Sequence, residues 1–119
     1  MEMKRMIAND LFLDSYVNKI KNDYADWMTR VCKNDQYGDP APRIKEFQEG
    51  VEMSFGTKYI KITSGGSAHS FIVNTKKDNK FKMGDILMAA SWAAPARNKA
   101  RGNIEDLDNY PRVRWNGVS

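Results

Sequence analysis

The chain has 119 residues, one cysteine and a net charge of +4, with 41% hydrophobic and 29% charged residues. This length and balance fit a single globular domain and exclude a disordered chain. A lone cysteine excludes an intrachain disulfide and favours a reducing, cytoplasmic compartment. No apolar run approaches the roughly 20 residues that a membrane span needs, so we expect neither a membrane span nor a signal peptide.

The charge is unevenly distributed along the chain. Residues 1–56 hold 8 Lys/Arg and 10 Asp/Glu, a net charge of −2, whereas residues 57–119 hold 11 and 5, a net charge of +6. A basic half favours an anionic partner such as nucleic acid. The alternative is that the basic half attracts the acidic half of the same chain or of a second copy.

Residues 8–34 have the pattern of a long amphipathic helix, whose ends we place at about residues 10 and 33. Asn9 or Asp10 can cap its first turn. Most apolar residues recur every three or four positions, which places them on one stripe; they are Leu11, Leu13, Val17, Ile20, Tyr24, Trp27, Met28 and Val31. We expect this stripe, together with Tyr16, to form core. A stripe of this kind can also pack against a second copy and make a homo-oligomer.

After a loop rich in helix breakers and a short helix that begins at Pro42 and stops at Gly50, the apolar period changes to two, which is typical of strands. Strands are predicted at residues 51–55, 58–63, 68–75, 86–90 and 110–115, with a Gly-rich hairpin turn at 64–67. The predicted fold class is therefore α+β in a single domain over residues 1–119. Its long N-terminal helix packs on a small antiparallel sheet, or partly open barrel, of about five strands within residues 51–117.

Residues 83–104 (MGDILMAASWAAPARNKARGNI) form the most unusual segment. Six alanines leave little bulk around Trp92, and Gly102 permits a positive φ. An arginine fork can grip a phosphate, and an indole face can stack a base. The candidate nucleic-acid-binding residues, which include two arginines of the last predicted strand, are Arg97, Lys99, Arg101, Arg112, Arg114 and Trp92.

Each of these candidates has a structural alternative. For Trp92 we expect that the indole fills the core, and we favour this over a role in base stacking. For the basic residues, the alternative is a solvated loop that Asn98 and Asn103 tie to the backbone through local hydrogen bonds.

The run from Lys58 to Gly117 resembles a family of short, uncharacterised tailed-phage proteins, notably marine ones. The similarity lies in a GDIL-x-AASW-x-APARN-x-ARGN core, here residues 84–103, and in a closing aromatic-Gly element, here Trp115-Asn116-Gly117. It covers about residues 57–117 and leaves out the N-terminal helix. The resemblance implies a viral origin and a location in the host cytoplasm, and it brings no known activity, cofactor or site residue.

Catalytic chemistry has little support in the sequence. His69 is the only histidine, and it lies two residues before Phe71, which places both on the same sheet face. A general base needs a nucleophile or acid within hydrogen-bond reach; the candidates are Ser67, Ser70 and Asp85. We expect instead a histidine that is bonded to the backbone, and therefore treat a hydrolase as the least favoured hypothesis.

Metal-ligand spacing is absent, and we expect the acidic residues Glu105, Asp106 and Asp108 to form a solvated turn. The sequence thus predicts a non-enzymatic, basic module that binds nucleic acid without metal or cofactor. The alternative is a protein-interaction or oligomeric module that acts on a host or phage protein.

Overall fold

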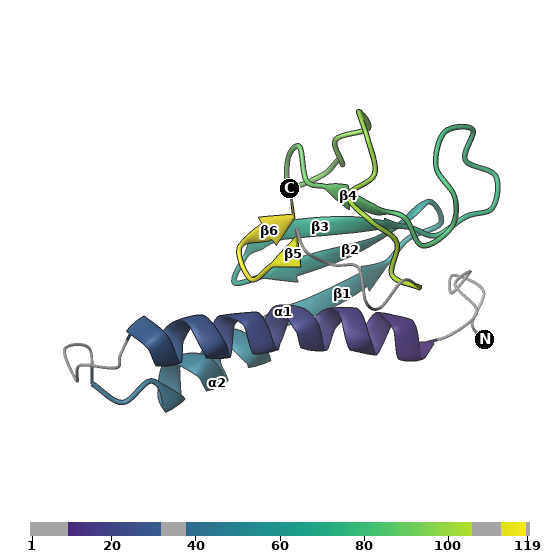
Figure 1. Cartoon of the computed structure of the whole chain (residues 1–119). Coiled ribbons are helices and arrows are strands. Elements are labelled where there is room, and N and C mark those ends of the chain that lie inside the picture. Colours follow the sequence, from purple (N-terminus) through teal and green to yellow (C-terminus); the bar gives the residue numbers. More distant parts are fainter. Residues whose placement is uncertain (1–9, 32–37, 106–112, 119) are drawn as a thin grey trace.

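The computed structural model describes residues 10–31, 38–105 and 113–118. Its elements in chain order are α1 (Asp10–Val31), α2 (Ala41–Glu49), β1 (Val51–Phe55), β2 (Tyr59–Ser64), β3 (Ser67–Val73), β4 (Ile86–Met88), β5 (Val113–Arg114) and β6 (Gly117–Val118). Strands β1 to β4 form one antiparallel sheet in that order, and β5 pairs with β6 in a second sheet (Figure 1). The predicted α+β class and the long helix are confirmed. The described strands form open sheets and do not close into a barrel.

Helix α1 buries its apolar stripe against one face of the sheet. Its buried residues are Leu13, Tyr16, Val17, Ile20 and Met28. Because side chains alternate along a strand, Ile60 and Ile62 of β2 both point to this face, where they join the same core cluster. Each such buried side chain contributes about 1.5–3 kcal/mol relative to exposure. The prediction that the stripe forms core is therefore confirmed for Leu13, Tyr16, Val17 and Ile20, which share one cluster with the sheet. Packing of α1 against a second copy stays a prediction.

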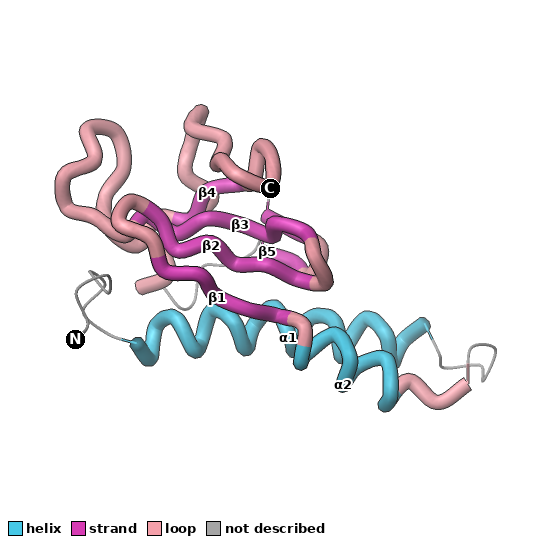
Figure 2. Tube along the Cα trace, turned by 180° about the vertical axis from the view of Figure 1, so that it is seen from behind, coloured by secondary structure: helices cyan, strands magenta, loops and turns pink. Residues whose placement is uncertain are grey.

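The opposite face of the sheet is covered by loops. Phe71, Val73 and Leu87 point to this side and pack with Phe81, which comes from the connection between β3 and β4. Figures 1 and 2 show both helices on one side of the sheet, and the loops that follow β3 and β4 on the other side. We call this second side the loop face, and it carries most of the predicted binding residues.

A β-bulge in β3 changes the direction of His69. The hairpin turn is as predicted, with positive φ at Gly65 (57°) and Gly66 (85°). Thr63 then pairs with Ala68, but Ile62 pairs with Ser70, so His69 is the extra residue. A bulge re-aims side chains, and His69 accordingly contacts Tyr16 of α1 rather than the cluster of Phe71 on the loop face. The prediction that His69 and Phe71 share a face is wrong for this reason.

Of the last predicted strand, residues 110–115, the structure describes the part from Val113 onward. There the strand ends at Arg114, and Trp115 lies in the turn between β5 and β6. Its backbone N–H donates to Asp23 Oδ2 of α1 (2.8 Å). Its indole lies among three aromatic rings of the two helices, whose centroids are 5.1, 5.0 and 5.9 Å away at Tyr24, Trp27 and Phe47. The hairpin is thus held against the helices by its turn.

Candidate functional site

The predicted binding segment runs back along the free edge of β4. Residues 95–103, which we call the return segment, follow an exposed turn at residues 90–94. The backbone bonds that join it to β4 are Ala96 N–H to Met88 O (2.7 Å), Arg101 N–H to Ile86 O (2.7 Å) and Ile86 N–H to Gly102 O (2.8 Å). Gly102 has the predicted positive φ, at 140°. The segment is therefore fixed to the sheet edge by main-chain bonds.

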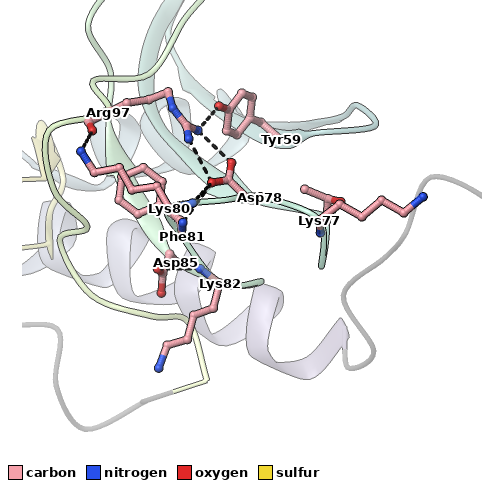
Figure 3. A network of polar contacts seen from close by, with 9 residues as sticks. Tyr59, Lys77, Asp78, Lys80, Phe81, Lys82, Asp85 and Arg97 are labelled. Atoms are coloured by element: carbon pink, nitrogen blue, oxygen red, sulfur yellow. Dashed lines mark hydrogen bonds and ion pairs between the residues drawn. The ribbon is translucent and has the colours of Figure 1, made fainter.

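Arg97 is the anchor between the return segment and the β3–β4 connection (Figure 3). Its Nη1 and Nη2 each donate to one oxygen of Asp78 at 2.9 Å, and Nη1 also donates to the Tyr59 hydroxyl at 2.7 Å. The guanidinium carbon lies 5.0 Å from the centroid of the Phe81 ring. The guanidinium that we predicted to grip a phosphate is thus engaged with protein groups, and its binding role stays a prediction.

The Asp78 carboxylate accepts four hydrogen bonds. Besides the two bonds from Arg97, its Oδ1 accepts the backbone N–H groups of Lys80 (2.8 Å) and Phe81 (2.9 Å), and its side chain is only 2% exposed. Hydrogen bonds from Arg97 and from these N–H groups hold the pKa of the Asp78 carboxyl well below its usual range. The same pair raises the pKa of Arg97. Asp78 is therefore an ionised carboxylate whose charge is balanced by Arg97, and its side chain presents almost no surface to solvent.

A second set of hydrogen bonds joins the end of the return segment, at Asn103, to the end of the β3–β4 connection, at Met83 and Asp85. Asn103 Nδ2 donates to Asp85 Oδ1 (3.0 Å) and to the Met83 carbonyl (3.1 Å). Gly84 has a φ of 90°, and a Cβ there would lie 3.0 Å from Asn103 Oδ1, so only glycine fits without strain. The prediction that Asn103 ties the loop by hydrogen bonds is confirmed.

Trp92 lies at the exposed turn after β4, with 54% of the residue exposed. The favoured interpretation, a core tryptophan, is wrong. The turn is closed by backbone bonds from Ala90 and Ser91 to the Ala94 carbonyl (3.0 and 3.1 Å), which hold the indole outside the sheet. On one side of the ring lies the Lys61 ammonium of β2, 3.7 Å from the ring centroid and within cation–π range.

Lys99 and Arg101 lie close together on the return segment. Asn98 Oδ1 accepts the Lys99 N–H (2.9 Å) and Arg101 Nη2 (3.1 Å), which confirms the predicted local role of Asn98. The Lys99 side chain is exposed and Arg101 is half-buried. Since neither cation forms an ion pair with a described carboxylate, both remain available to an anion.

The two arginines of the C-terminal segment are not part of this group. Arg114 is exposed on β5, in the hairpin that packs on α1, and its carbonyl oxygen accepts a bond from His69 (2.7 Å). Arg112 lies outside the described residues, as do Asp106 and Asp108 of the predicted acidic turn.

A recess of about 480 Å³ opens beside the Arg97 anchor. Its lining residues are Thr57, Lys58, Thr75, Lys77, Asp78, Asn79 and Arg97. Lys58 and Lys77 are exposed, and they form no ion pair within the described part of the chain. We did not predict these lysines as site residues, nor Lys61. Lys61 could have been identified from the alternation along β2, because this pattern puts Tyr59 and Lys61 on the face opposite Ile60.

His69 is fully engaged inside the protein. Its Nε2 lies 2.7 Å from the Arg114 carbonyl, which can only accept, so Nε2 carries the proton and Nδ1 accepts from the Ser70 hydroxyl (2.9 Å). Ser70 in turn bonds to the Tyr16 hydroxyl (2.7 Å). Asp85 is occupied with Asn103, so the hydrolytic constellation is not assembled, and the predicted backbone bond is confirmed. Burial lowers the pKa of His69, and the bond to Arg114 partly opposes this.

Comparison of the chain with family models, with curated proteins and with solved structures gives no match. Neither described helix combines the length and the apolar character needed to cross a bilayer.

Proposed function

We propose that the chain binds nucleic acid through its loop face. One observation carries this proposal: residues 57–105 contain nine Lys/Arg but only three Asp/Glu, and two of the three acids are turned inward. Asp78 is bonded to Arg97, and Asp85 is bonded to Asn103. Glu105 is then the one exposed carboxylate of this segment. A segment with this excess of cations over exposed carboxylates attracts phosphates.

Several of these cations can reach a phosphate backbone without breaking an existing ion pair. Lys58 and Lys77 border the recess beside Arg97, and Lys99 and Arg101 extend along the return segment. The Arg97–Asp78 pair supports the proposal by holding the two loops in place, which reduces the ordering cost of binding. The cations thus form a preorganised surface.

The test is a salt titration of binding to a single-stranded oligonucleotide with a matched pair of variants. Lys99→Ala/Arg101→Ala removes two loop-face cations, while Lys19→Ala/Lys45→Ala removes two exposed cations from α1 and α2. Affinity should fall as salt rises, and the slope of log K against log salt should decrease by about 1.4 in the loop-face variant, because each lost phosphate contact accounts for about 0.7. The helix variant should keep the wild-type slope.

Two results would overturn the proposal. One is the absence of binding at low salt. The other is an equal loss in both double variants, since that would mean that net charge alone, and not the loop face, governs binding.

A further inference from the structure

Trp92 is the one large apolar side chain that is exposed among the described residues. An indole left in solvent forgoes about 1.5–3 kcal/mol of burial, and what distinguishes Trp92 is the cation that lies against its ring. The turn does not need the indole to form, because hydrogen bonds from the backbone N–H groups of Ala90 and Ser91 to the Ala94 carbonyl close it.

The surroundings of Trp92 leave the indole accessible and place a cation against one of its faces. Its neighbours in the turn at residues 90–94 are alanines and a serine, all exposed, so no bulky side chain of the turn shields the ring. On one face, Lys61 Nζ lies 3.7 Å from the ring centroid. Attraction between the cation and one face of the ring favours this orientation, and a ring that is already oriented loses less entropy when a second ring stacks on it.

The indole and the cationic recess lie along the same strand. Lys61, which contacts Trp92, and Tyr59, which is bonded to Arg97 at the recess, point to the same side of β2. Residues two apart on a strand are separated by about 7 Å. The residue that contacts the indole and the residue that is bonded to Arg97 therefore lie about 7 Å apart along β2, and Lys58 and Lys77 line the recess on the Arg97 side.

We infer that Trp92, supported by Lys61, stacks an unpaired nucleobase, and that a phosphate of the same strand lies in the recess beside Lys58 and Lys77. This inference rests on the proposed function and narrows its ligand to a single strand. Bases within a duplex are stacked on each other and offer no free face to an indole, whereas single-strand binding commonly combines an aromatic surface with a basic groove.

The test compares Trp92→Ala and Trp92→Phe with the wild type on four probes of about 12 nucleotides, within the site sizes typical of such proteins. The probes are single-stranded DNA, single-stranded RNA of the same sequence, the DNA duplex and an abasic DNA strand with the same number of phosphates. Trp92→Ala should lose about tenfold in affinity for the single strands. It should bind the duplex and the abasic strand as the wild type does, with an unchanged salt slope, and Trp92→Phe should keep most of the single-strand affinity.

The outcomes separate this inference from the proposed function. If the wild type binds no probe at low salt, the proposed function fails. If it binds but Trp92→Ala loses no more on the single strands than on the abasic strand, only the stacking site fails. A loss on DNA, on RNA or on both supports the site and identifies the natural class of strand; a loss on neither overturns it.

Discussion

Asp78 and Arg97 form a bidentate ion pair on the loop face, with both Nη–Oδ distances at 2.9 Å. The two residues are 19 positions apart: Asp78 lies in the β3–β4 connection and Arg97 in the return segment after β4. The same guanidinium also donates to the Tyr59 hydroxyl of β2. The pair therefore joins both loops to the sheet. It also divides the predicted basic group into an anchor, Arg97, and cations that stay unpaired, such as Lys99.

Replacing Asp78 by Asn should destabilise the protein in a pH-dependent way. The pKa of Asp78 is lowered by folding, so its contribution is fully present above the unfolded pKa of about 3.9 and is lost as pH falls through the range below it. The urea midpoints of the wild type and Asp78→Asn should therefore differ most above pH 5, and the difference should shrink progressively as the pH falls below 4. A difference that stays constant down to pH 3 contradicts the assignment of Asp78 as a paired carboxylate.

His69 should make stability fall as the solution becomes mildly acidic. Burial lowers its folded pKa, so below the unfolded pKa of about 6.5 the unfolded state takes up a proton that the folded state resists. The wild type should lose up to about 1.4 kcal/mol per pH unit below pH 6.5, and His69→Gln should lack this component. Because His69 is the only histidine, its NMR titration is unambiguous; a folded pKa at or above 6.5 speaks against the buried neutral form.

Short-range patterns were enough to predict much of the fold. The three- and four-residue spacing of Leu13, Val17 and Ile20 located the buried side of α1, and the alternation of Ile60 and Ile62 located the inner face of β2. These patterns depend on the geometry of one helix or one strand, which the local sequence determines.

The features that were missed depend on pairing between distant segments. The bulge at His69 follows from the register of β2 against β3, and a one-residue change in register reverses the face of a side chain. Trp92 sits among alanines, which are compatible with a core or with an exposed turn, and only the closure of the turn by Ala94 distinguishes the two. The Asp78–Arg97 pair joins two loops whose relative position no local pattern specifies.

Two tryptophans should differ sharply in what they contribute to stability. Trp92 is 54% exposed and has Lys61 on one face, so Trp92→Ala should cost less than about 1 kcal/mol. Trp115 contacts three aromatic rings in the turn of the last hairpin, so Trp115→Ala should cost about 2–3 kcal/mol. Urea unfolding measures both. Similar costs for the two would mean that Trp92 is retained for packing and not for contact with a ligand.

Lys61 should act on binding partly through Trp92, and a double-mutant cycle separates the two contributions. In the wild-type background, Lys61→Met removes a cation and also releases the indole, so affinity for a single strand should fall by more than one phosphate contact explains. In a Trp92→Ala background only the charge remains to be lost, and the decrease should be smaller. The coupling arises because the ammonium lies 3.7 Å from the ring it holds. Additive effects, with the same loss in both backgrounds, would instead make Lys61 an independent phosphate contact and leave the orientation of Trp92 to its turn.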